Sequence, residues 1–464
     1  MQHKFGALDL IRAGLQDLDR ARTLFDELHN DGIDDDRMRL LLATLEKACD
    51  PDIALSNLVD IIKVMQSQGK DFTNIIADEN SFVRLITVLG VSDEMGKLMR
   101  FRPELVEAAA NDACESHLYN HEQRRAHVLK SVGADPNDHT MPTASLPLAE
   151  AATALRKTYR KQLAAIMAQD ATANDPIEIQ PRISTELSDL ADAALEGALA
   201  IARHEVDGSG HVRFAIIGMG KLGAQELNYV SDVDLIYVVE PADADTNGMT
   251  LSRVGTKMAT TLQRVCQSVI MGVAEPTLWQ IDGGLRPEGK DGPLVRRLES
   301  HEAYYEQWAE NWEFQALLKA RPVAGDSDLG QAYMSMTRPF VWTASKRDNF
   351  VYDCQQMRKR VEDLIPNPLK DREIKLGRGG LRDVEFTVQM LQLVHGRSDE
   401  ALRTSSTLRI PASLGRRWIR VTQTSQKTLM GLPIRTSAGT PTANVGAQTH
   451  PPVPGPRQSQ RGRP

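Results

Sequence analysis

Most of the chain has the hydrophobic spacing of amphipathic helices. Apolar side chains recur at helical intervals over residues 5–130, and the same spacing returns over Leu148–Met167, Leu187–Glu205 and Ser252–Met271. The stretch Val132–Leu146 is instead rich in turn-forming residues. The pattern predicts a mainly helical protein whose first part is a helical platform without an evident group of reactive side chains.

Two short apolar runs interrupt this helical pattern. The first, Phe214–Ile217, leads into a glycine-rich turn, and the second, Val233–Val239, begins beside Asp232 and Asp234. Side chains two residues apart lie on the same face of a strand, so both carboxylates should share one side of a sheet. Two such charges about 5 Å apart repel by roughly 3 kcal/mol at an effective dielectric constant near 20. A bound cation is therefore expected between them.

The glycine turn also fits a dinucleotide-binding pattern. Gly218–Gly223 reads G-x-G-x-x-G, and Glu240 follows roughly 20 residues later. Only about ten residues separate Gly220 from Ser231, which leaves little room for the crossover helix of parallel strands. The paired acids also stand at the start of the second run, whereas the Rossmann acid stands at its far end. A phosphate-binding Walker A loop is excluded because Lys221 lacks the required spacing and is followed by an apolar residue. A metal-binding acidic strand is favoured over a dinucleotide site.

A third acid ends a short apolar segment further along the chain. Asp282 follows the strand candidate Leu278–Ile281 and precedes a glycine- and proline-rich loop that carries Arg286, Lys290 and Arg296. An aspartate before two glycines is usually a turn former, and on residue type alone these basic side chains are a solvated loop.

The segment Tyr304–Ala320 is predicted to be one amphipathic helix. Tyr305, Trp308, Trp312 and Leu318 are spaced to form one apolar face, and they are expected in the core.

Composition narrows the class of protein. The 464 residues carry a formal net charge of −7, which argues against a general nucleic-acid binder because such binding needs Lys and Arg to neutralise phosphates. The four cysteines form no C-x-x-C pair, so neither a zinc site nor a disulfide framework is indicated. No apolar run has the length of a signal peptide or a membrane span, so we expect a cytoplasmic protein without a membrane partner.

Phe214–Glu240 resembles the nucleotidyltransferase signature of the DNA polymerase β superfamily. Within that superfamily the sequence is similar to the bacterial glutamine synthetase adenylyltransferase and adenylyl-removing enzymes, over roughly residues 40 to 409. The segments that carry this resemblance are Asp50–Leu58, Val83–Met95, GMGKLGAQELNYVSDVDLIYV, Leu285–Arg296, Tyr304–Asp326 and Gly379–Gly396. The last of these contains a GGLRD motif that also resembles the PII uridylyltransferases. The resemblance implies an α+β, mostly helical fold, with a polymerase β-like nucleotidyltransferase domain that has a small mixed sheet and flanking helical regions.

The resemblance also implies a set of site residues. Asp232, Asp234 and Asp282 would be the catalytic carboxylates and would hold Mg²⁺, as two ions. Contacts with an ATP or ADP nucleotide are implied for Gly218, Gly220, Lys221, Ser231, Arg286 and Lys290. Gly284 stands where many members have an arginine, so a phosphate contact there is not expected. The polar residues that the family keeps in this region are Glu313, Gln315, Lys319 and Arg321, and each is a weaker candidate for the site.

Family members carry two nucleotidyltransferase halves, and the motifs here resemble the N-terminal half. That half removes AMP from a tyrosine of glutamine synthetase by phosphorolysis, with phosphate consumed and ADP formed. Adenylyl transfer from ATP to glutamine synthetase is the alternative direction. An inactive remnant that only binds glutamine synthetase or the PII signalling protein is the non-enzymatic alternative.

Four segments are predicted. These are a helical region over residues 1–205, the nucleotidyltransferase domain over 206–345, the start of a helical bundle over 346–409, and a tail over 410–464. No acid occurs after Glu400, while Pro, Gly, Ser, Thr and Arg accumulate. Such a composition predicts disorder, and the loss of resemblance after Arg409 suggests a frameshifted or truncated product.

Overall fold

The computed structural model describes residues 5–408 apart from 71, 73–74, 76, 111–118, 245 and 370–371. The predicted disorder and aberrant origin of the tail from residue 410 concern residues outside that range. Within the described residues the chain forms two compact units. One comprises the residues up to Asn120 together with Lys157–Ile183, and the other comprises His121–Arg156 and the residues from Ser184 onward. The four predicted segment boundaries remain a prediction.

The first unit is built from short helices with acidic or hydroxyl N-caps. In five of these helices the side chain of the N-cap residue accepts a hydrogen bond from a backbone N–H of the first turn. These N-cap residues are Asp17, Asp34, Asp50, Asp78 and Ser92. Buried side chains of α4 pack against α6 and α7. The helices here are α1 (Ala7–Arg12), α2 (Leu18–Asn30), α3 (Asp35–Leu45), α4 (Pro51–Ser67), α6 (Glu79–Val91), α7 (Asp93–Phe101) and α8 (Glu104–Ala110).

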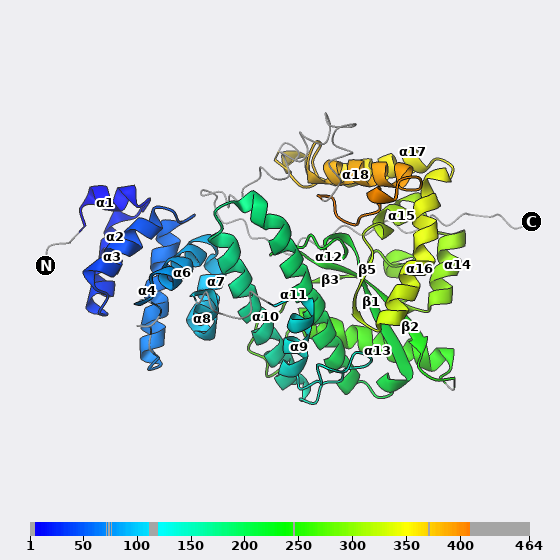
Figure 1. Cartoon of the computed structure of the whole chain (residues 1–464), viewed down its shortest axis with the longest axis horizontal. Coiled ribbons are helices and arrows are strands. Elements are labelled where there is room, and N and C mark those ends of the chain that lie inside the picture. The colour runs from blue at the N-terminus through cyan, green and yellow to red at the C-terminus, as the bar shows by residue number, and fades with distance from the viewer. Residues whose placement is uncertain are drawn as a thin grey trace, which may run out of the picture. The chain divides into compact units, whose positions relative to one another are not determined.

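The second unit surrounds a small sheet with helices (Figure 1). The division between the units falls inside two long helices, α10 (Leu148–Ala171) and α11 (Pro176–Glu205). The other helices are α9 (His121–Ser131), α12 (Gly220–Gly223), α13 (Gly248–Gln267), α14 (Leu298–Gln307), α15 (Asn311–Leu317), α16 (Ser327–Thr343), α17 (Phe350–Asp363) and α18 (Leu381–His395). Short 3₁₀ turns lie at Ser209–His211, Gly289–Asp291, Ala344–Lys346, Asn367–Leu369 and Glu400–Leu402.

The sheet is mixed and has five strands in the order β3-β2-β1-β5, with β4 also paired to β2. The strands are β1 (Val212–Gly218), β2 (Val233–Pro241), β3 (Ile281–Asp282), β4 (Val295–Arg296) and β5 (Arg321–Gly325). The two predicted apolar runs are β1 and β2, and they pair antiparallel. A Rossmann unit requires parallel strands joined by a crossover, so this pairing excludes it.

Helices cover both faces of the sheet, which explains why β1 and β2 are apolar on both faces. Ala215, Ile217, Ile236 and Val238 belong to one core with side chains of α14, α15 and α16. On the other face Tyr237 receives a hydrogen bond from Gln263 of α13. A Cβ added to Gly255 of α13 would lie 3.1 Å from Val239.

The predicted single helix over Tyr304–Ala320 is wrong in one respect. The helix is broken between α14 and α15, and Trp308 at the break is 73% exposed instead of buried. A new helix starts after Glu310, whose backbone N–H donates to the Glu313 carboxylate at 2.9 Å in a capping box. Trp308 is the C-cap of α14 and lies outside its regular helix, so it does not continue the buried face that contains Tyr305.

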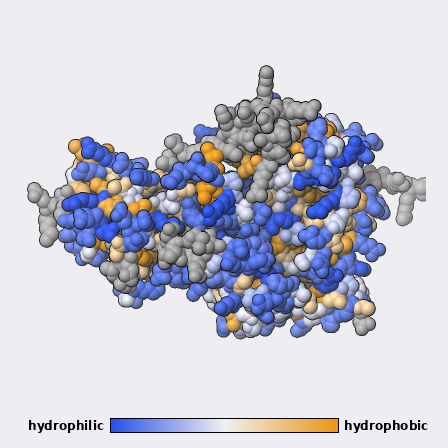
Figure 2. Space-filling model, in the orientation of Figure 1, coloured by the Kyte–Doolittle hydropathy of each residue, from blue (hydrophilic) through white to orange (hydrophobic). Residues whose placement is uncertain are grey.

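The predicted α+β, mostly helical fold with a small mixed sheet is confirmed. The exposed residues on the side seen in Figure 2 are largely hydrophilic, as expected when helices cover the apolar strands. Within the part of the chain that the structure describes, none of the helices combines the length and apolar character needed to cross a bilayer.

Candidate active site

The glycine turn between β1 and β2 folds back onto the start of β2. Met219 donates its backbone N–H to the carbonyl of Asp234 at 2.8 Å. The turn then forms the single helical turn α12, in which Gly223 N–H donates to the Met219 carbonyl at 2.9 Å. These bonds place the turn beside the Asp234 side chain.

Gly220 is at a position where a side chain would collide with that aspartate. Its φ of +53° lies in the left-handed region, and a Cβ there would lie 2.3 Å from Asp234 Oδ2. Because glycine has no side chain, the Asp234 carboxylate can occupy this position.

Asp282 lies opposite Asp234. Strands β2 and β3 pair in parallel, with Asp234 and Asp282 as register partners. Asp282 Oδ1 accepts the backbone N–H of Gly284 at 2.7 Å, and a Cβ on Gly284 would lie 2.9 Å from the same oxygen. Asp232 stands one residue before β2. The sheet thus brings together two carboxylates from separate strands, each beside a glycine, and Asp232 precedes Asp234 by two residues in the chain.

These groups suit a hard divalent cation. All the prospective ligands are carboxylate oxygens, which Mg²⁺ prefers, and the space beside Gly220 and Gly284 is the kind that a Cβ would fill. The pairing of β3 with β2 supplies what the sequence alone left open, namely that Asp282 lies beside Asp234 on the neighbouring strand. Their roles as metal ligands and catalytic groups remain a prediction.

The predicted basic residues differ in how their donors are used. Arg286 donates to the carbonyl oxygens of Gly283, Lys290 and Gly292, so its guanidinium organises its own loop. Burial lowers the pKa of Arg286, and the nearby Asp282 opposes this shift. Lys290 is exposed on the same loop.

Lys221 projects from the glycine turn into a charged environment. Partial burial lowers the pKa of its ammonium group, and Lys375 and Arg382 reinforce the effect, whereas Glu385 and Asp232 oppose it. Gly218 is packed so closely on β5 that a Cβ would lie 2.6 Å from Val323. Ser231 is half-buried beside Asp232. Lys221 thus follows Gly220 in the turn and is influenced by the charge of Asp232, while contacts with a nucleotide remain a prediction.

A buried lysine joins the loop after the turn to the helix with the GGLRD motif. Lys319 forms ion pairs with Glu226, at 3.3 Å, and with Glu385 of α18. Glu226 also accepts four hydrogen bonds from Ser406, Thr407 and Leu408. Lys319 therefore links the segment that follows the turn to α18, and its ammonium group is paired with these two carboxylates.

An acidic stripe on α11 lies behind the turn. Asp189, Asp192 and Glu196 are spaced so that they share one side of the helix. Asp189 accepts from Gln225 at 3.1 Å, Glu196 accepts from the backbone of Gly325 at 2.7 Å, and Asp192 pairs with Arg321. Sequence reasoning missed this stripe, although three acids at helical spacing among the apolar residues of this part of the helix were a signal.

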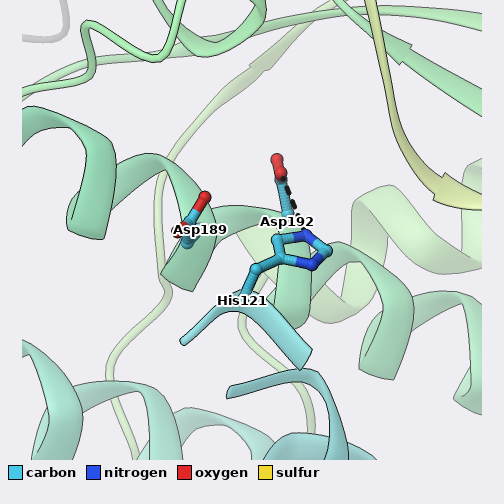
Figure 3. Close-up of side chains that lie close together, drawn as sticks. All are labelled: His121, Asp189 and Asp192. Atoms are coloured by element: carbon cyan, nitrogen blue, oxygen red, sulfur yellow. Dashed lines mark ion pairs between the residues drawn. The ribbon is translucent and has the colours of Figure 1, made fainter. Parts of the chain in front are cut away.

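Figure 3 shows His121 beside this stripe, with its ring directed at Asp192 and Asp189 next to it. Among the described residues these three side chains form the group whose ligand atoms all lie within 4.8 Å of one another. His121 Nε2 lies 3.6 Å from Asp192 Oδ2, and this pairing raises the pKa of the histidine. Because the Arg321 guanidinium already holds both Asp192 oxygens, we assign no metal to this cluster.

Of the two remaining polar candidates, Gln315 donates to Gln389 at 2.8 Å. Glu313 is buried and accepts the Tyr304 hydroxyl at 3.0 Å. Burial raises the pKa of Glu313 to about 7. Both side chains make contacts within the helical core.

Glu313 should make stability fall as the pH rises. Its folded pKa of about 7 exceeds the ordinary value of 4.5, so the associated stability is fully present below about pH 4.5 and is lost as the pH passes 7. Relative to Glu313→Gln, the wild-type free energy of unfolding should decrease by roughly 1 to 3 kcal/mol between pH 4.5 and 8. Urea unfolding of both proteins across this range measures the difference. A constant difference would contradict the assignment.

Comparison with known proteins identifies the family of the chain. Residues 82–336 match the family model described as glutamate-ammonia ligase adenylyltransferase, and residues 355–435 match a PII-uridylyltransferase model. The second match includes the GGLRD motif and extends beyond Arg409, where the resemblance was expected to end.

Several curated relatives share the name bifunctional glutamine synthetase adenylyltransferase/adenylyl-removing enzyme. The protein of Bifidobacterium longum strain DJO10A is 76% identical over 405 residues, which are 87% of this chain and 38% of that protein. Those of Cutibacterium acnes and Streptomyces avermitilis are 43% and 41% identical, over 86% of this chain and 40% and 38% of their own lengths. The chain thus spans about two fifths of the length of these relatives. Since the family model covers more than half of it, the chain belongs to the glutamate-ammonia ligase adenylyltransferase family.

Proposed function

We propose that this chain removes AMP from adenylylated glutamine synthetase by phosphorolysis. The observation that carries the proposal is the register of β2 and β3, in which Asp234 and Asp282 lie opposite each other beside Gly220 and Gly284. The name of the relatives supports the substrate, and the likeness of the motifs to the N-terminal half supports the direction.

In the proposed reaction an oxygen of orthophosphate attacks the phosphorus of the AMP-tyrosine bond. The bond from phosphorus to the tyrosine oxygen breaks, the tyrosinate leaves and takes up a proton, and ADP is formed. Asp232, Asp234 and Asp282 would hold Mg²⁺, which supplies neutralisation of charge at the phosphoryl oxygens when bound. The chain's own contribution is to hold these carboxylates in place and to leave space beside them at the two glycines.

The charge balance calls for further cationic groups. Phosphate brings up to two negative charges to an anionic phosphodiester, while three carboxylates leave two Mg²⁺ ions a surplus of only about one positive charge. We assign this role to Lys221, because it follows Gly220 in the turn and is influenced by the charge of Asp232. Lys290 would add charge from the neighbouring loop, whereas Arg286 would act by shaping that loop.

The test is incubation of the purified chain with adenylylated glutamine synthetase and Mg²⁺, with and without phosphate. We expect release of ADP that saturates with phosphate, without free AMP. Labelling of unmodified glutamine synthetase from ATP, independent of phosphate, would instead support the adenylyl-transferring direction. Binding of glutamine synthetase without either reaction would support the non-enzymatic alternative.

A contact with the PII signalling protein is a further part of the proposal. It rests on the match of residues 355–435 to the PII-uridylyltransferase model. Addition of purified PII to the same assay should change the rate of ADP release, and an unchanged rate together with no binding would argue against this partner.

A further inference from the structure

We propose that Arg321 and Asp192 are positioning residues for the site, an inference that rests on the function proposed above. They act from behind the glycine turn, so that the turn keeps Asp234 in its place. Neither residue belongs to the acidic set that would hold the metal ions.

The first step of the argument is the geometry of Arg321. Its Nη1 and Nη2 contact the two Asp192 oxygens at 2.5 and 3.1 Å, which is a bidentate pair. The same guanidinium donates to the backbone of the turn, with Nη2 3.0 Å from the Leu222 carbonyl and Nε 3.3 Å from that of Gly223. One side chain therefore ties α11 to the end of α12.

The two carbonyls matter because α12 is a single turn. The Leu222 carbonyl accepts the backbone N–H of Gln225 at 3.1 Å, and the Arg321 guanidinium adds a charged donor to this carbonyl and to that of Gly223 at the end of the turn. Asp192 is 1% exposed, so its charge would be costly to bury without the guanidinium. The pair thus anchors α12 to the long helix α11.

The second step connects the turn to Asp234. At its start, Met219 N–H donates to the Asp234 carbonyl, and Gly220 lies against Asp234 Oδ2. Arg321 is also the register partner of Gly218, the last residue of β1. Movement of α12 would therefore change the space beside the Asp234 carboxylate, and an error of about 1 Å in such positions costs roughly a hundredfold in rate.

The sheet contains a matched control pair. Arg213 of β1 forms the same kind of fork with Asp326, at 2.7 and 3.0 Å. Val212 and Arg213 lie at the opposite end of β1 from Gly218, and the Arg213 fork makes no contact with α12 among the described residues. Loss of this bidentate pair should lower the free energy of unfolding without moving α12.

The experiment compares Arg321→Lys with Arg213→Lys in the phosphate-dependent assay. Lysine keeps the charge but cannot form the planar fork. For Arg321→Lys we expect kcat to fall by roughly tenfold to a hundredfold with KM for adenylylated glutamine synthetase changed by less than about twofold. Arg213→Lys should keep kcat within about twofold of the wild type. Equal kcat losses in both variants, or wild-type kcat in Arg321→Lys, would overturn the proposal.

Amide hydrogen exchange provides a readout that does not depend on activity. In Arg321→Lys and in Asp192→Asn, peptides covering Gly218–Leu227 should exchange faster than in the wild type, while Arg213→Lys should leave them unchanged. If these variants exchanged faster but the wild-type chain released no ADP, the positioning role would be supported and the proposed function would be refuted. Unchanged exchange in both α12-directed variants would refute the positioning role itself.

Discussion

Replacing Asp234 by asparagine should abolish turnover. Asparagine keeps the shape of the side chain and removes the charge that would hold the metal opposite Asp282. Charge stabilisation worth several kcal/mol depends on this ligand set, so we expect kcat to fall by about a thousandfold or more. Asp282→Asn should have a comparable effect. The measurement is phosphate-dependent release of ADP from adenylylated glutamine synthetase at saturating Mg²⁺.

The same substitution should not weaken the fold. In the absence of metal, Asp234→Asn removes a like-charge repulsion, so thermal unfolding should occur at the same or a slightly higher temperature. Asp291→Asn is the matched control, because Asp291 is exposed on the loop that follows Asp282. It should retain activity within about twofold of the wild type. Wild-type activity of Asp234→Asn would show that the acids have another role.

The two central strands were predictable because their signals are local. Two apolar runs that are covered on both faces have the pattern of buried strands, and they form β1 and β2. Asp234 lies in β2 and Asp232 just before it, while their shared side remains a prediction. The break at Trp308 was missed because a periodic apolar pattern continues across it. The capping box of Glu310 and Glu313 was the competing signal.

The side-chain contacts around the site could not be predicted from local sequence patterns. Arg321 and Asp192 are 129 residues apart, and their pairing depends on the path of β5 past α11. Arg286 has the residue type of a phosphate ligand, yet its donors meet carbonyls of its own loop. Charge and residue type indicate which groups are available, while tertiary contacts decide how each one is used.

Replacing Gly223 by alanine should destabilise the second unit strongly. A Cβ at this position would lie 1.8 Å from the Lys319 carbonyl oxygen and 2.4 Å from that of Gly218. Both obstacles are backbone atoms, one at the end of β1 and one shortly before β5, so no side-chain rotation relieves the overlap. We expect the free energy of unfolding to fall by about 3 kcal/mol or more, at the upper end of what overpacking costs.

Gly210→Ala is the matched control for this substitution. Gly210 is exposed, and an added Cβ would meet nothing within 4 Å. The control should therefore change the free energy of unfolding by less than about 1 kcal/mol. Urea unfolding followed by tryptophan fluorescence measures both variants against the wild type. If Gly223→Ala unfolded at the wild-type urea concentration, α12 could not be packed on Lys319 as described, and the support of Asp234 by the turn would have to be reconsidered.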